Sequence, residues 1–147
     1  LKKVVVMGPN ADSRESLLGN YNGKPSRMLT PLQAIRERLN GWAEVVYIKG
    51  MDHVTGVSES QLKEYVNQAK GADVVLFVGG ISPRLEGEEM PVSKDGFDGG
   101  DRTTITLPEV QTQVMKALVA ARIPTVFVMM TAARWLFLGK QGIFRLF

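Results

Sequence analysis

The sequence has no cysteine and only one histidine, His53, among its 147 residues. The lack of cysteine excludes thiolate catalysis, disulfides and metal sites built from thiolates. A single histidine cannot form a histidine-rich zinc site, and no Ser-His-Asp set is indicated, so we expect His53 to be a loop residue. No apolar run reaches the about 18 residues of a membrane-spanning helix, and residues 1–6 lead into a strand-like run rather than a signal peptide.

The composition is that of one ordinary globular domain, with 44% hydrophobic and 22% charged residues. The net charge of +3 is concentrated in residues 132–147, which hold three basic residues and no acidic one. Residues 1–131 carry 15 charges of each sign and show no basic stripe of the kind that follows phosphates. A nucleic-acid partner is therefore not expected.

Short apolar runs alternate with segments of helical periodicity along the chain. We expect buried strands at residues 4–7, 45–48, 73–78 and 125–130. Thr30 and Ser58 are expected to cap two helices, and Pro108 to precede a third. Gln61 lies three residues after Ser58 and completes a capping box. This alternation predicts a three-layer α/β/α sandwich, in which an open, mostly parallel sheet has helices on both faces.

The turn after the first expected strand has the sequence Gly-Pro-Asn-Ala-Asp at residues 8–12. It has neither the glycine spacing of a dinucleotide-binding loop nor the Gly-Lys-Ser/Thr ending of a P-loop, so no phosphate site is indicated. We expect Asn10 and Asp12 to stabilise this turn through bonds from their side chains to nearby backbone.

The segment from residue 80 to residue 107 is several times longer than the usual connection in a compact α/β domain. It follows a central-looking strand, and open α/β sheets bind their ligands at the carboxyl ends of such strands. We expect this loop to be functional and to have no regular secondary structure. Its acidic residues are Glu86, Glu88, Glu89, Asp95, Asp98 and Asp101.

Three interpretations fit this acidic loop when only its residue types are considered. The first is a solvated surface loop without a specific function. The second is a calcium site, since carboxylates are suitable ligands, although the spacing does not match an EF-hand. The third is acid/base chemistry by one glutamate held between glycine and apolar neighbours.

The loop and the start of the chain also resemble a known family. Residues 77–90 (FVGGISPRLEGEEM), 99–102 (GGDR) and 107–108 (LP) are similar to the second, α/β-sandwich domain of glycoside hydrolase family 3. Residues 4–12 (VVVMGPNAD), 18–23 (LGNYNG) and 30–35 (TPLQAI) are similar to the beginning of the same domain. The resemblance covers roughly residues 2–131, with the motifs in the family's order.

This resemblance implies a Rossmann- or flavodoxin-like domain from a retaining, exo-acting β-glycosidase, either a β-glucosidase or a β-xylosidase. In that family a preceding (β/α)8 barrel supplies the aspartate nucleophile and most sugar contacts, and the second domain supplies the acid/base glutamate. The family's position falls on Glu86, with Glu88 as the alternative, while Asp101 and Arg102 are expected to organise the loop. The implied substrate is a β-linked glucoside or xyloside, with no cofactor and no metal, and the implied location is periplasmic or secreted.

We assign residues 1–131 to this domain in partial form and residues 132–147 to an atypical basic and aromatic tail. The domain is expected to be truncated at its C-terminal end, which would leave the last strand as an edge available for homodimer formation. A membrane anchor is the alternative for the tail, although Gly139 and Gly142 would interrupt a helix.

The resemblance also implies that the nucleophile and the sugar pocket lie in the missing barrel. The isolated 147-residue chain is therefore expected to be catalytically inactive. The alternative function is a non-catalytic α/β module that binds a sugar or calcium through the carboxylates of residues 86–101.

Overall fold

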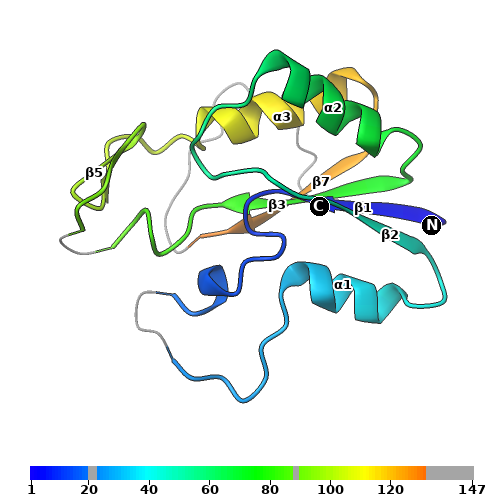
Figure 1. Ribbon diagram of the computed structural model, residues 1–147, viewed down its shortest axis with the longest axis horizontal. Helices are drawn as coiled ribbons and strands as arrows, with labels where there is room; N and C mark the ends of the chain where they lie inside the picture. The colour runs from blue at the N-terminus through cyan, green and yellow to red at the C-terminus, as the bar shows by residue number, and fades with distance from the viewer. Residues whose placement is uncertain (20–22, 88–89, 132–147) are drawn as a thin grey trace.

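A computed structural model describes residues 1–19, 23–87 and 90–131 of the chain. Its main sheet has four parallel strands in the order β2-β1-β3-β7, with α1 on one face and α2 and α3 on the other (Figure 1). The strands are β1 (Lys3–Met7), β2 (Glu44–Ile48), β3 (Val74–Gly80) and β7 (Thr125–Met130). The helices are α1 (Pro31–Leu39), α2 (Glu59–Ala69), α3 (Glu109–Ala120) and the short 3₁₀ helix η1 (Glu15–Leu17). The predicted three-layer sandwich with a parallel sheet is confirmed.

The starts of the first two helices follow from their capping side chains. Thr30 accepts a hydrogen bond from the backbone of Gln33, and Ser58 accepts one from the backbone of Gln61, both at 3.2 Å. In each case the glutamine side chain returns a bond to the backbone N–H of the capping residue, which completes a capping box. The third helix begins directly after Pro108, as predicted, without a side-chain cap.

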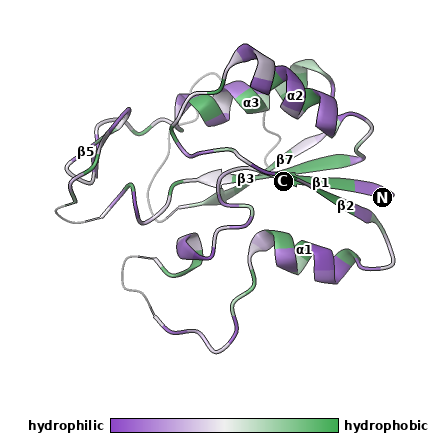
Figure 2. Ribbon diagram, in the orientation of Figure 1, coloured by the Kyte–Doolittle hydropathy of each residue, from purple (hydrophilic) through white to green (hydrophobic). Residues whose placement is uncertain are grey.

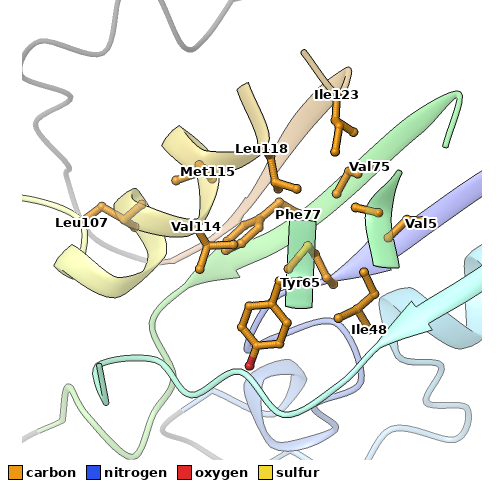
Figure 3. Close-up of a cluster of buried hydrophobic side chains, with 12 residues drawn as sticks. Val5, Ile48, Tyr65, Val75, Phe77, Leu107, Val114, Met115, Leu118 and Ile123 are labelled. Atoms are coloured by element: carbon orange, nitrogen blue, oxygen red, sulfur yellow. The ribbon is translucent and has the colours of Figure 1, made fainter. Parts of the chain in front are cut away.

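The central strands β1 and β3 are mostly buried, because successive side chains point to opposite faces of the sheet and helices cover both faces there. The expectation of a buried strand at residues 125–130 was wrong, because β7 lies at an edge of the described sheet and leaves Val126, Val128 and Met129 exposed. One cluster packs under α2 and α3; Figure 3 shows Phe77 there, beside Val114 and Leu118. A second cluster packs between the sheet and α1, with Leu32 fully buried against Val6 and Val78. Figure 2 shows the corresponding hydropathy, with hydrophobic residues along the strands and hydrophilic ones spread over the helices.

The strand expected at residues 73–78 is longer at its carboxyl end than predicted. It continues through Gly79 and Gly80, which pair with Met129 and Met130 of β7. Glycine is unfavourable inside strands because it has no side chain to pack, so the prediction ended the strand before this pair. Here the lack of a side chain is what the packing requires, as the geometry around both glycines shows below.

The prediction of no regular structure in the loop was wrong. Three short antiparallel strands form a second sheet: β4 (Ser93–Lys94), β5 (Phe97–Asp98) and β6 (Asp101–Arg102). Two-residue connections join them, Asp95-Gly96 and Gly99-Gly100, and such dipeptides are the turn residues that favour tight hairpins. In Figure 1 this small sheet stands at the carboxyl end of the main sheet, on the side where β3 ends.

Within the described ranges, β7 pairs with β3 on one side only, and Val126 and Val128 are 43% and 38% exposed. Self-association through this edge stays a prediction, and the tail of residues 132–147 lies outside the described residues. No helix in the part of the chain that is described has the length and apolar character needed to cross a membrane.

Candidate active site

The carboxyl ends of β1 and β3 lie next to each other at the centre of the sheet, where the connections diverge to opposite faces. From β1 the chain proceeds to α1 below the sheet, and from β3 it proceeds through the loop to α3 above it (Figure 1). This arrangement is the topological switch point at which open α/β sheets bind ligands. Gly8 allows the close approach of the two strands there, because a Cβ at that position would lie 2.3 Å from the carbonyl oxygen of Val78.

Glu86 lies on the first part of the loop, six residues after the end of β3. The turn that carries it forms when the carbonyl of Ser82 accepts bonds from the N–H of Leu85 at 3.0 Å and of Glu86 at 3.4 Å. The Nε of Arg102 donates to Glu86 Oε1 at 3.2 Å. The Arg102 side chain is 13% exposed and that of Glu86 is 31% exposed, so this is a partly buried ion pair that still faces solvent on one side.

The two residues expected to organise the loop lie in different surroundings. Arg102 donates a hydrogen bond to the Glu86 carboxylate. Asp101 is exposed, and its contribution within the described structure is the backbone pairing of β6 with Asp98 of β5. Glu88, the alternative acid/base residue, and Glu89 both lie outside the described residues.

The segment around Glu86 is fixed by close backbone contact with the second hairpin. Gly87 N–H donates to the carbonyl of Gly100 at 3.2 Å, and Met90 N–H donates to that of Gly99 at 3.1 Å. Gly100 has φ +89°, and a Cβ there would lie 2.2 Å from the carbonyl oxygen of Gly87. Gly100 is thus required for this approach.

A small apolar cluster lies beneath the loop. Ile81, Leu85 and Phe97 are buried together, with Val54 and Val92 packed against them. Burying three such side chains stabilises the loop by about 1.5–3 kcal/mol each before the entropy of ordering it is subtracted. The loop is therefore a folded unit with its own small core, and the solvated surface loop considered from the sequence does not describe it.

Asn10 has a different role from the one expected. Its Nδ2 donates to the carbonyl oxygens of Gly79 at 3.3 Å and Ile81 at 3.1 Å, on another strand, and not to its own turn. Its Oδ1 lies 2.7 Å from Ser16 Oγ and 2.7 Å from His53 Nε2. Because Asn10 Nδ2 faces two carbonyls, Oδ1 is the acceptor, and His53 donates to it from Nε2.

Asp12 also acts outside its own turn. Its Oδ1 accepts a bond of 2.7 Å from the hydroxyl of Thr30, the residue that caps α1. The expectation that both residues stabilise the turn through nearby backbone was therefore wrong for each. The residue types of a turn indicate bonds within that turn only. They do not reveal that Asp12 binds a residue 18 positions away or that Asn10 binds residues 69 and 71 positions away.

His53 lies in a loop, as predicted, but it is half-buried and hydrogen-bonded at the switch point. Burial lowers the pKa of its imidazole, and the nearby charges of Asp52 and Glu15 oppose that effect without cancelling it. The neutral form is thus favoured in the folded chain. Throughout the described ranges, no group of three or more acidic or histidine side chains is placed to hold a metal ion.

The geometry defines a class of protein, a doubly wound α/β domain that presents a carboxylate on an ordered loop at its switch point. Residues 1–138 match the family model described as the glycosyl hydrolase family 3 C-terminal domain. The chain therefore belongs to glycoside hydrolase family 3, and it represents that family's C-terminal domain.

Individual proteins agree with this assignment. The chain is 54% identical over 66 residues to a xylan 1,4-beta-xylosidase of Xylanibacter ruminicola. These 66 residues make up 45% of this chain and 8% of that protein. It is 32% identical to beta-D-xylosidase 3 of Arabidopsis thaliana over 89% of this chain and 15% of that protein. Among solved structures, a family 3 exo-beta-xylosidase, XlnD, superposes with a TM-score of 0.69 at 30% identity, covering 88% of this chain and 15% of that one.

A beta-glucosidase from Listeria innocua, solved with glucose, superposes with a TM-score of 0.64 at 25% identity and covers 87% of this chain and 16% of that one. The chain thus spans less than a fifth of the length of each of these relatives. The described fold corresponds to one domain of a much longer enzyme in each case.

Proposed function

We propose that the full-length protein containing this chain is a retaining, exo-acting β-glycosidase and that Glu86 is its general acid/base. The observation that supports this most directly is the placement of Glu86, ion-paired with Arg102, on the loop that leaves the sheet at its switch point. The substrate class is a β-linked xyloside or glucoside, since the relatives are named as β-xylosidases and β-glucosidases.

A retaining glycosidase requires two carboxyl groups about 5 Å apart, one to attack the anomeric carbon and one to exchange a proton. In the proposed mechanism a missing N-terminal barrel domain supplies the nucleophile and the sugar pocket. Glu86 first protonates the departing glycosidic oxygen and then removes a proton from the water that releases the sugar. A long loop with its own core suits this task because it carries one carboxyl across to another domain.

Arg102 has a definite part in this proposal. The bond from Nε holds one carboxylate oxygen and limits rotation of the side chain. The Glu86 side chain is 31% exposed, although its Oε2 atom is itself buried in this chain.

The test is Glu86→Gln in the full-length enzyme, assayed on a xylobiose-type or cellobiose-type substrate and on an activated dinitrophenyl glycoside. We expect the rate of bond cleavage to fall about 10²- to 10⁴-fold on the disaccharide, whose leaving group needs protonation. The first step on the activated substrate needs no proton and should be nearly unaffected. An equal loss in that step on both substrates would contradict the general-acid role of Glu86, and Glu88→Gln then tests the alternative position.

A further inference from the structure

Gln111 is a fully buried amide in the first turn of α3, with 0% of its surface exposed. Its Oε1 accepts a bond of 2.9 Å from Gly80 N–H, and its Nε2 donates to the carbonyl of Gly80 at 2.7 Å and to that of His53 at 3.0 Å. A buried amide is costly unless it is hydrogen-bonded. All three bonds go to backbone groups at the carboxyl edge of the sheet, so the amide serves that edge and not the helix.

The paired bonds to Gly80 continue the sheet beyond the point where β1 stops. The last β1–β3 pair joins Met7 to Phe77, after which Asn10 N–H donates to the carbonyl of Val78 at 3.1 Å. Gly80 lies two residues further along β3, and residues two apart on a strand present their backbone groups to the same side. Gln111 therefore supplies a donor and an acceptor on the side of β3 that faces β1, beyond the last β1–β3 pair, while β7 pairs with the other side.

The two glycines at this strand end make room for Gln111 on one hand and for β7 on the other. A Cβ on Gly79 would stand 2.5 Å from Gln111 Oε1, and Gly80 has φ +113° with its Cβ position 2.1 Å from the carbonyl oxygen of Met130. Both positions require glycine for steric reasons. Gly79 thus leaves space for the Gln111 side chain, and Gly80 leaves space for the close approach of β7.

Asn10 binds the carbonyls of the two residues that flank Gly80 in the sequence. Its Nδ2 bonds to Gly79 and Ile81, so two buried side-chain amides together fix the backbone of residues 79–81. His53 joins the two amides, since its carbonyl accepts from Gln111 and its Nε2 donates to Asn10. Three separate segments converge on the first residues of the loop.

We propose that Gln111 is a positioning residue that sets where the acid/base loop leaves the sheet and thereby places Glu86. This inference rests on the proposed function of Glu86. The connection is short and ordered: Ile81 and Leu85 are buried in the small cluster under the loop, and the carbonyl of Ser82 holds the N–H of Glu86. A shift at Gly80 is transmitted to the carboxylate because no flexible segment lies between them in the described structure.

The test is Gln111→Met in the full-length enzyme, which keeps the length of the side chain and removes all three bonds. We expect kcat on a disaccharide substrate to fall about 10- to 100-fold, because a displacement of about 1 Å at a catalytic group has that effect. KM should change little, and the cleavage step on an activated dinitrophenyl glycoside should be nearly unaffected. The matched control is Gln113→Met, on the exposed face of the same helix, which should leave all rates unchanged.

A purely structural role for Gln111 predicts a lower melting temperature with equal losses on both substrates, and that result would overturn the proposal. Unchanged kinetics would overturn it as well. If the methionine variant does not fold, Gln111→Glu, which retains the acceptor for Gly80 N–H, is assayed and interpreted in the same way. The role of Glu86 is judged separately from that of Gln111. If Glu86→Gln loses more rate on the disaccharide than on the activated glycoside and Gln111→Met does not, only the positioning role of Gln111 is rejected.

Discussion

Arg102 and Glu86 form an ion pair at 3.2 Å across 16 residues of one loop. Arg102 lies in β6, the last strand of the small sheet, and Glu86 lies in the turn closed by the carbonyl of Ser82, before the small sheet begins. Their contact closes the loop on itself, together with the backbone bonds from Gly87 to Gly100 and from Met90 to Gly99. These contacts within the loop hold the Glu86 carboxylate from one side, in addition to the contacts of Gln111 where the loop leaves the sheet.

The first prediction concerns this pair. Arg102→Met should lower kcat on a disaccharide substrate about 10- to 100-fold, because Glu86 loses the bond that orients it. The effect on an activated aryl glycoside should be smaller in the cleavage step, since that step depends less on the acid. Steady-state and burst kinetics on both substrates measure the two effects.

The matched control is Arg84→Met. Arg84 lies on the same loop and its Nε donates to Glu15, but its side chain is 77% exposed. An exposed pair of this kind contributes less than about 1 kcal/mol, so activity should be unchanged. Equal losses in the two arginine variants would mean that the loop responds to charge in general and not to the contact with Glu86.

Much of the fold was predictable because local chemistry and global structure agree. The capping boxes at Thr30 and Ser58 mark helix starts in the sequence, and both are formed as expected. The apolar run before Gly79 is buried on both faces, as its composition indicates. Each of these signals lies within a few consecutive residues, so it can be recognised without knowing the three-dimensional structure.

The features that sequence did not reveal depend on contacts between distant segments. Gln111 has ordinary helical surroundings in the sequence, and its partners Gly80 and His53 lie 31 and 58 residues away. The dipeptides Asp95-Gly96 and Gly99-Gly100 were a usable signal for the two hairpins and could have revealed the small sheet. Nothing in the residue pattern alone indicates that Asn10 bonds across to Ile81.

The second prediction concerns Gly100. Gly100→Ala places a Cβ 2.2 Å from the carbonyl oxygen of Gly87 at a φ of +89°, so the loop must open. We expect a local loss of about 1–3 kcal/mol, seen as faster amide hydrogen exchange in residues 85–102, with the main sheet unchanged. Gly56→Ala is the control, because open space surrounds that position. Faster exchange in the β-strands of the main sheet would contradict a purely local role.

The third prediction is a pH dependence of stability from His53. Burial lowers the pKa of this histidine in the folded chain from its ordinary value of 6.5, so the unfolded chain binds the proton first. The folded state is therefore fully favoured above about pH 6.5 and loses stability as the pH falls below that value. His53→Gln removes the titrating group, and urea unfolding of both proteins between about pH 7.5 and about pH 5 isolates its contribution. The difference in unfolding free energy between them should shrink towards low pH, and a constant difference would refute the linkage.

The fourth prediction separates this domain from the enzyme. The 147-residue chain produced alone should not hydrolyse nitrophenyl β-xyloside or β-glucoside above the buffer rate, because a retaining reaction needs a second carboxyl group as nucleophile. The full-length protein should hydrolyse one of the two, and the preferred one identifies the sugar. Any hydrolysis by the purified chain must be compared with its Glu86→Gln variant, since a contaminating glycosidase would be unaffected by that change. Activity that disappears with Glu86→Gln in the isolated chain would show that the chain holds a complete site, and the division of the catalytic groups between two domains would then be wrong.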